Sequence, residues 1–176
     1  WPRLPAGHLG ANAELMRSGA DRIETVVPGK GGHGAHPYLT VDPVLVAGHI
    51  ISAVQSIVAR NVSPVDSAVI SICAMQAGDI GAFSVIPREA RLIGTVRTFR
   101  PEVQDMVEER LARLVDSVAV AFGATASLHY QRTYPATINS GQHAMFAADV
   151  AASIVGEDRV TRQLSPSMGA EDFSFM

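Results

Sequence analysis

The sequence predicts an α+β protein built around a ferredoxin-like βαββαβ unit, with a four-stranded antiparallel sheet and both helices on one face. Three observations support this prediction. Residues 22–132 alternate between strand-like and helix-like patterns in the order β-α-β-β-α-β. Each helical segment carries an apolar stripe along one side. A glycine-rich turn at residues 29–37 separates the first strand from the first helix.

The first strand is expected at residues 22–27, which are rich in β-formers. A helix follows from Asp42, its expected N-cap, with Pro43 at the first helical position, to about Asn61. Its apolar stripe consists of Val46, Ile50, Val54, Ile57 and Val58. We interpret His49, beside this stripe, as a half-buried packing residue and not as a ligand.

The second strand is expected at residues 67–77, where apolar side chains occur at both alternations and both faces are expected to be covered. The third strand, residues 90–99, alternates more clearly. One face would carry Leu92, Gly94 and Val96, and the other Arg91, Ile93, Thr95, Arg97 and Phe99.

A second helix is predicted from Pro101 to Phe122, with Gly123 as its C-terminal stop. The fourth strand covers residues 125–132 and leaves His129 on its exposed side. The other face and the edge strands of such a sheet would be open, and dimerisation through the sheet or its helices is the natural remedy.

The flanking segments differ in character from this unit. Residues 1–17 read as irregular, and residues 135–176 contain an expected helix at 142–155 and a short strand or extended run at 159–164. We therefore expect a unit at residues 18–134 that is inserted between two parts of another domain. Because the chain starts on Trp and stops on an aromatic-rich run, we expect it to be a piece of a longer protein.

Composition excludes several classes of function. The net charge is −3 and no basic block occurs, which argues against a nucleic-acid surface. The single cysteine, Cys73, lies in an apolar run and cannot form a disulfide within the chain, which fits the reducing cytoplasm. We recognise no apolar run of transmembrane length and no signal peptide, and expect no membrane partner.

The stretch Gly29-Lys30-Gly31-Gly32-His33-Gly34-Ala35-His36-Pro37 shapes the backbone and presents His33 on it. A histidine in such a position can donate a hydrogen bond to a developing oxyanion, act as a base or bind a metal. The alternative is a tight glycine-rich turn that carries a surface histidine.

Further motifs follow in a fixed order. They are Thr40-Val41-Asp42-Pro43, Asn61-Val62, Ser84-Val85-Ile86-Pro87, Gly94-Thr95-Val96-Arg97-Thr98-Phe99, Tyr134-Pro135-Ala136-Thr137-Ile138-Asn139 and Met168-Gly169-Ala170-Glu171-Asp172-Phe173. Together with the glycine-rich stretch, this series resembles the M20 family of metal-dependent amidohydrolases, in the branch of hippurate hydrolases and indole-acetyl-amino-acid hydrolases.

The resemblance implies a catalytic domain with a dinuclear centre, usually zinc or manganese, interrupted by a βαββαβ lid that forms a homodimer. Trp1-Pro2 resembles the pair that follows a metal-binding histidine in this branch. On this basis residues 1–17 and 135–176 belong to an incomplete catalytic domain. Two divalent ions are expected in the full-length parent, whereas this chain alone is expected to hold no metal site and to be inactive.

The resemblance also assigns roles to individual residues. His33 matches the lid histidine that reaches into the partner subunit's site and stabilises the oxyanion of the tetrahedral intermediate. Arg97 matches an arginine that holds the substrate carboxylate, for which its planar fork is suited. Ser84 stands where the family usually has a substrate-binding asparagine, so this contact and the specificity can differ.

The loop formed by Gly169, Ala170 and Glu171 matches a substrate-facing segment whose backbone N–H groups are available to a carboxylate. Asn139 matches a structural turn. His36 and Tyr38 occupy positions where the branch often has Met and His, so neither is assigned a catalytic role.

The resemblance therefore implies that the parent protein hydrolyses the amide bond of N-acyl or N-aroyl amino acids. A peptidase or deacetylase activity within the same family is a further possibility. The alternative from a different class is a non-catalytic ferredoxin-like domain for dimerisation or small-ligand binding, because fold alone does not fix function.

Overall fold

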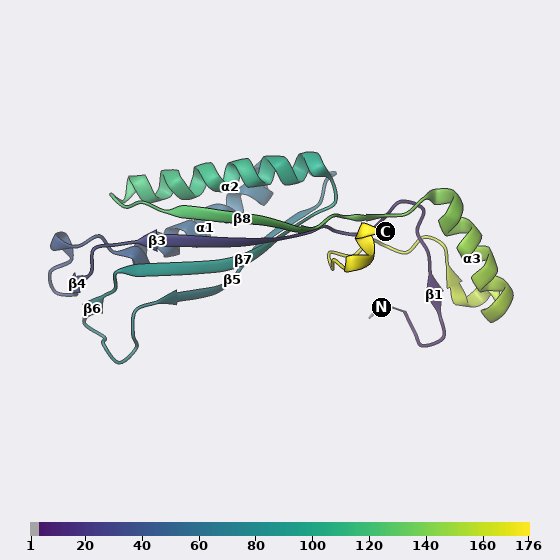
Figure 1. The fold of residues 1–176 in the computed structure, drawn as a ribbon, viewed down its shortest axis with the longest axis horizontal. Helices are drawn as coiled ribbons and strands as arrows, with labels where there is room; N and C mark the ends of the chain where they lie inside the picture. Colours follow the sequence, from purple (N-terminus) through teal and green to yellow (C-terminus); the bar gives the residue numbers. More distant parts are fainter. Residues whose placement is uncertain (1–3) are drawn as a thin grey trace. The chain divides into compact units, whose positions relative to one another are not determined.

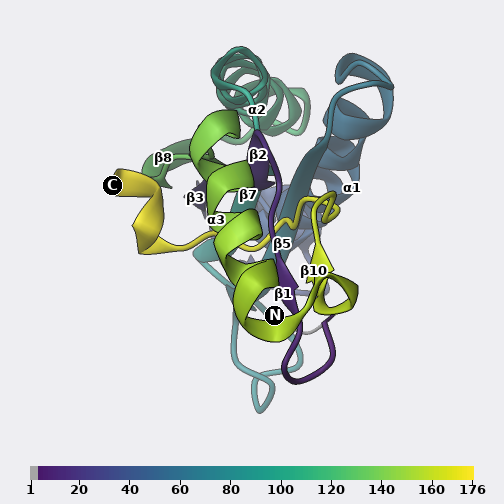
Figure 2. The same cartoon turned by 90° about the vertical axis from the view of Figure 1, so that its right-hand side faces the viewer.

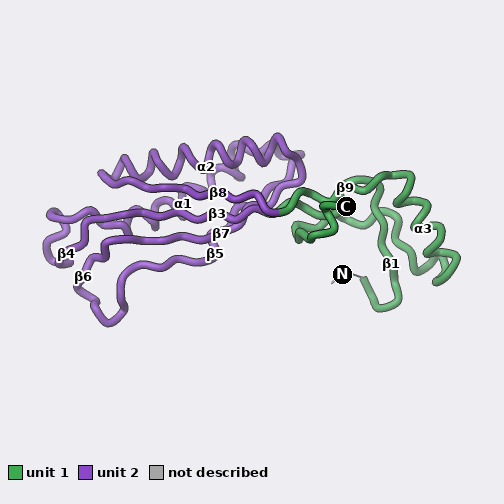
Figure 3. The backbone as a smooth tube through the Cα atoms, in the orientation of Figure 1, with its two compact units in different colours: residues 1–20, 134–176 green, residues 21–133 purple. Residues whose placement is uncertain are grey.

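The structure, a computed structural model, describes residues 4–176. The chain divides into two compact units, residues 21–133 and residues 1–20 with 134–176 (Figure 3). The backbone passes from one unit to the other twice, after residue 20 and after residue 133. The predicted boundaries were 18 and 134, and the assignment of the outer segments to a catalytic domain stays a prediction. The expectation for Trp1-Pro2 lies outside the described residues.

Residues 21–133 form the predicted layer of helices on a four-stranded antiparallel sheet. The strands, in the order β5-β7-β3-β8, are β5 (Ala68–Ala77), β7 (Glu89–Thr98), β3 (Ala20–Pro28) and β8 (Ser127–Tyr134). Helices α1 (Pro43–Asn61) and α2 (Pro101–Ala121) pack side by side on the sheet (Figure 1). The α+β, ferredoxin-like fold class is confirmed.

Helix α1 begins as its sequence predicts. The Asp42 carboxylate accepts hydrogen bonds from the backbone N–H groups of Val44 at 2.9 Å and Leu45 at 3.4 Å, so the N-cap satisfies two of the otherwise unpaired donors of the first turn. By length and composition alone α1 could cross a membrane. This corrects the expectation that no apolar run of the chain reaches transmembrane length. Here it is a core helix that buries Pro43, Val46, Ala47, Ile50, Val54 and Ile57.

The core lies between the helices and the sheet. Burial in β7 alternates residue by residue, and Leu92 and Val96 are fully buried on the helix side. Helix α2 contributes Val103, Val107, Leu111, Val115 and Ala119. This alternation confirms the predicted division of the faces of this strand.

Strand β5 differs from its prediction. Only Ile70 is buried along it, Cys73 is exposed, and the register with β7 shifts between Ile72 and Ala74. The expectation that both faces are covered is wrong, because β5 is an edge strand and its second half is largely exposed.

The sheet face opposite the helices is polar. Arg91 pairs with Glu89 at 2.6 Å and with Glu24 at 3.7 Å, and Arg22 pairs with Glu24 at 3.5 Å. These exposed ion pairs contribute little stability individually. Arg97 lies on the same face of the sheet, since it follows Arg91 by an even number of positions along β7.

His49 and His129, which the sequence analysis placed beside a helical stripe and on a strand, are both surface residues. His129 is exposed on β8, as predicted. His49 is exposed rather than half-buried, and its ring stacks on Phe122 with centroids 4.3 Å apart. The spacing of apolar residues in α1 predicts on which side of the helix His49 lies. It does not predict that Phe122, which follows the end of α2, packs against it.

The second unit contains short elements that the sequence did not reveal. Residues 9–10 and 15–17 were read as irregular, yet β1 (Leu9–Gly10) pairs in parallel with β10 (Val160–Thr161), and β2 (Leu15–Arg17) pairs antiparallel with β9 (Thr137–Ile138). Strand β10 lies within the short strand or extended run that was expected at 159–164. Figure 2 shows β1 and β10 beside α3.

Helix α3 (Gly141–Val155) matches its predicted position. Only Ala148 is buried in it, whereas Phe146, Val150 and Ile154 are exposed. Two 3-10 turns follow, η2 (Glu157–Arg159) and η3 (Asp172–Phe175). The apolar side chains of α3 are therefore mostly uncovered by the described residues of this unit.

Candidate functional site

The glycine-rich stretch forms a loop tip beyond the sheet. Strand β4 (Gly32–His33) pairs antiparallel with β6 (Val85–Ile86), and the 3-10 turn η1 (Pro37–Leu39) follows it (Figure 1). The backbone N–H of Gly34 donates to the carbonyl of Ser84 at 2.7 Å. Two segments about 50 residues apart in sequence thereby hold each other in place.

The glycines are required by close backbone approach. A Cβ at Gly31 would lie 2.8 Å from the carbonyl oxygen of Ile86, and one at Gly29 would lie 2.5 Å from that of Val41. Both distances are shorter than real Cβ atoms show. The sequence pattern is thus explained by the need to bring this loop against β6 and the start of α1.

The ring of His33 has a defined orientation. The backbone N–H of Ala35 donates to Nδ1 of His33 at 3.1 Å. A ring nitrogen that accepts a hydrogen bond carries no proton, so in the neutral ring the proton lies on Nε2. His33 is exposed, and its ring lies 5.8 Å from that of His36, centroid to centroid. The Nε2 N–H of the exposed, neutral His33 ring is therefore the group available to donate a hydrogen bond.

Ser84 lies next to this histidine in space. It sits in a turn closed by the hydrogen bond from Val85 N–H to the Ala82 carbonyl at 2.9 Å. The tip therefore brings together two of the predicted site residues, His33 and Ser84.

Arg97 is not part of this tip. It occupies the far end of β7 from β6, on the open face of the sheet. At the usual rise per residue, Arg97 lies about 26 Å along β7 from Glu89, the first residue of the strand. Arg97 is half-buried as a residue, and its guanidinium has no hydrogen-bond or ion-pair partner within residues 4–176. It is free to bind an anion.

Gly169, Ala170 and Glu171 belong to the other unit. The Gly169 N–H is engaged by the Ser167 hydroxyl at 3.2 Å, and the carbonyl of Glu171 accepts from Ser174 at 2.7 Å. The backbone N–H groups of Ala170 and Glu171 have no partner in the described part of the chain. Of the three predicted loop donors, two are therefore available.

Asn139 directly follows β9 and forms hydrogen bonds to two residues that precede β2. Its backbone N–H donates to the backbone carbonyl of Glu14 at 2.8 Å, and its side-chain amide donates to the backbone carbonyl of Asn12, also at 2.8 Å. These contacts are those of a structural residue.

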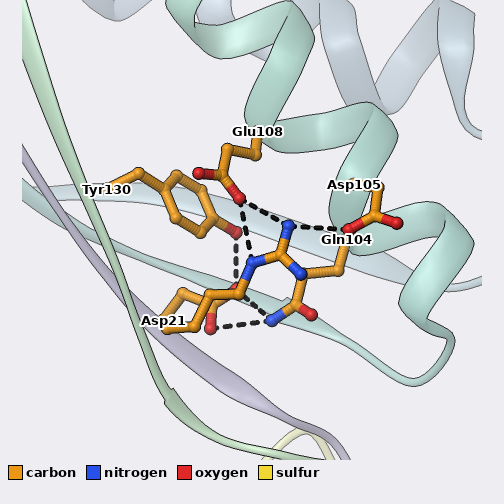
Figure 4. A network of polar contacts seen from close by, with 6 residues as sticks. Asp21, Gln104, Asp105, Glu108 and Tyr130 are labelled. Carbon is orange, nitrogen blue, oxygen red and sulfur yellow. Dashed lines mark hydrogen bonds and ion pairs between the residues drawn. The ribbon is translucent and has the colours of Figure 1, made fainter.

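A buried polar network was missed at the sequence level. Asp21 is 3% exposed, and its carboxylate accepts hydrogen bonds from Tyr130 at 2.5 Å and from the Gln104 amide at 2.8 and 2.9 Å (Figure 4). Burial raises the pKa of the Tyr130 phenol far above its usual value, and the hydrogen bond to Asp21 raises it further. The only sequence signal was an aspartate directly before an otherwise β-rich strand.

The described residues do not form a metal centre. No three histidine, cysteine, aspartate or glutamate side chains of residues 4–176 come together as a ligand set. Glu171 and Asp172, although adjacent in sequence, have no third partner of this kind there. The donor set that residues 4–176 offer does not fit a dinuclear metal site.

Comparison with known proteins gives a consistent assignment. A family model described as the M20 peptidase dimerisation domain matches residues 15–122. An N-acetylcysteine deacetylase of Bacillus subtilis is 39% identical over 173 residues, which cover 98% of this chain and 44% of that protein. A hippurate hydrolase of Campylobacter jejuni is 34% identical over 180 residues, which cover 99% of this chain and 46% of that protein.

A solved structure agrees. A Bacillus subtilis protein described as a dinuclear metal binding peptidase from the M20 family superimposes with a TM-score of 0.74 at 32% identity, over 99% of this chain and 42% of that one. The chain thus spans less than half the length of these relatives.

Proposed function

The chain belongs to the M20 peptidase family through its dimerisation domain, and on this premise we propose that the whole protein hydrolyses the amide bond of N-acyl or N-aroyl amino acids. Two relatives are named for such amides, a deacetylase of N-acetylcysteine and a hydrolase of hippurate. Since both are more than twice as long as this chain, the activity is proposed for the full-length protein and not for this part of it.

The orientation of His33 is the observation that carries the proposal. Its Nδ1 accepts a hydrogen bond from the Ala35 N–H, so in the neutral ring Nε2 is the nitrogen that can donate. In amide hydrolysis negative charge develops on the carbonyl oxygen as the tetrahedral intermediate forms. A donor already in place there lowers the barrier by about 2.7–4 kcal/mol.

Arg97 is proposed to bind the carboxylate of the amino acid, with Ser84, Gly169, Ala170 and Glu171 as further substrate contacts. Because one chain holds His33 and Arg97 at opposite ends of the sheet, both can contact one small substrate only if two copies supply them. This separation supports a homodimer in which His33 serves the site of the partner subunit.

The cofactor proposed for the full-length protein is a pair of divalent ions, zinc or manganese. One relative is described as a dinuclear metal binding peptidase. Residues 4–176 do not fit that centre, so its ligands are expected from other parts of the full-length protein.

The proposed location of the protein is the cytoplasm, which the single cysteine supports.

The test uses the full-length protein and a panel of N-acyl amino acids. His33→Ala should lower kcat by about 10²–10³-fold while the metal content stays unchanged. His33→Gln keeps an N–H donor and should recover part of the loss. His129→Ala, at an exposed histidine of the same unit, is the matched control. An unchanged kcat in His33→Ala would support the non-catalytic alternative for this domain.

A further inference from the structure

Val85 lies directly opposite His33 in the β4–β6 pair. Residues that face each other in an antiparallel pair project their side chains to the same side, with Cβ atoms about 4.5–5.5 Å apart. Both side chains are exposed, Val85 at 57%. The isopropyl group of Val85 and the imidazole of His33 therefore form one small surface with an apolar half and a donor half.

Other exposed apolar side chains occur around this surface. They come from the two loops that meet at the tip and include Tyr38, Leu39, Ile80 and Phe83. A single exposed valine needs no explanation. Val85 differs from the others because the register of β4 and β6 places it beside the histidine that the glycines position.

The orientation of the ring decides what Val85 can contact. With Nδ1 bonded to Ala35, a carbonyl oxygen bound to His33 sits at Nε2, at a distance of about 2.9 Å. The two substituents of that carbonyl carbon are then within a few ångströms of the surface that Val85 and the imidazole of His33 form together. One is the acyl chain, and the other is the amide nitrogen that leads to the amino acid with its carboxylate.

We propose that Val85 contacts the acyl group of the substrate and sets the preference for its size and polarity. This inference rests on the proposed function. The acyl side is favoured because Val85 offers neither a donor nor an acceptor to a carboxylate-bearing amino acid. The substrate class that follows is amino acids with an apolar N-acyl group, in preference to polar or charged acyl groups such as succinyl.

The experiment compares Val85→Ala and Val85→Thr with the unmodified full-length protein. One substrate series varies the acyl group on a single amino acid (acetyl, hexanoyl, benzoyl, succinyl), and the other varies the amino acid under a constant acetyl group. Val85→Thr, nearly identical in shape, should shift the ratio of kcat/KM for hexanoyl against succinyl roughly tenfold toward succinyl. Val85→Ala should change the ratio of benzoyl to acetyl by a similar factor. Ratios within the amino-acid series should not change.

Val65→Thr provides the matched control, since Val65 is 90% exposed in the same unit and lies shortly before Ala68, which pairs with Thr98 at the end of the sheet away from the tip. The outcomes separate the two proposals. If His33→Ala lowers kcat on every substrate but the Val85 variants leave the acyl ratios unchanged, or alter only the amino-acid series, the role of Val85 is overturned and the proposed function stands. If the unmodified full-length protein hydrolyses none of these amides, the proposed function itself fails.

Discussion

Tyr130 donates a 2.5 Å hydrogen bond to the carboxylate of Asp21, 109 residues away in the sequence. Asp21 is the first residue of the unit 21–133, and Tyr130 lies three residues before the chain leaves it. Gln104 on α2 binds the same carboxylate with its amide. Strands β3 and β8, through which the chain enters and leaves this unit, are thereby linked by hydrogen bonds to each other and to helix α2.

Tyr130→Phe should destabilise the unit by about 1–3 kcal/mol, because a buried carboxylate loses one of its donors. Denaturant unfolding of the purified chain measures this change. Ser117→Ala, on the exposed side of α2, is the control and should lie within about 0.5 kcal/mol of the unmodified chain. Equal stability of Tyr130→Phe and the unmodified chain would show that the network adds nothing.

The same tyrosine predicts a pH dependence. Its pKa is raised in the folded state by burial and by Asp21, so the unfolded chain loses the phenolic proton first. This contribution to stability is complete below the unfolded pKa of about 10 and declines as the pH rises above it. Unfolding measured between pH 8 and 11 should show a steeper alkaline decline for the unmodified chain than for Tyr130→Phe. Parallel curves would contradict the prediction.

Arg132 should matter much less. It pairs with Asp105 and Glu108 at 2.6 Å each, but these side chains are 36–64% exposed. Solvent screening reduces such pairs to about 0–1 kcal/mol. Arg132→Met should therefore cost less than Tyr130→Phe, and the difference from the unmodified chain should shrink in high salt. A loss that is large and independent of salt would mean that burial, not exposure, governs this pair.

Two glycines give opposite predictions. A Cβ at Gly94, in a central strand, would lie 2.3 Å from the Ser71 carbonyl oxygen, whereas at Gly48, in α1, it would meet nothing within 4 Å. Gly94→Ala should destabilise by more than about 1 kcal/mol, and Gly48→Ala should stabilise by up to about 1 kcal/mol. Thermal unfolding of both variants checks the pair, and the same sign for both would refute the argument.

Arg97→Met should raise KM for N-acyl amino acids in the full-length protein with little loss of stability, because the guanidinium has no partner to lose among residues 4–176. The comparison substrate is the same amide with the carboxylate replaced by a carboxamide. KM for that neutral substrate should be unaffected. An equal rise for both substrates would remove the carboxylate-binding role.

Much of the fold follows from local pattern. Asp42 and Pro43 mark the start of α1, and the alternation around Leu92 gives the two faces of β7; both predictions are confirmed. The family prediction is confirmed as well. These features depend on residues within a few positions of one another, where periodicity and capping are informative.

The remaining features depend on distant contacts. The β4–β6 register that places Val85 beside His33 joins segments about 50 residues apart, and two-residue strands such as β1 and β9 carry no periodic signal. The edge position of β5 is a property of the sheet order and not of its own apolar run. The roles of His33, Ser84, Arg97 and the loop 169–171 stay predictions.

The hydrogen bond from Ala35 to His33 has a consequence for how this loop can vary among homologues. The ring is oriented by a peptide group, and every amino acid except proline supplies that N–H. The side chain at position 35 can therefore vary among homologues while the backbone N–H at this position is still required. A search for functional residues by conservation alone would overlook it, and a single change to proline there would release Nδ1 and alter which nitrogen of His33 carries the proton.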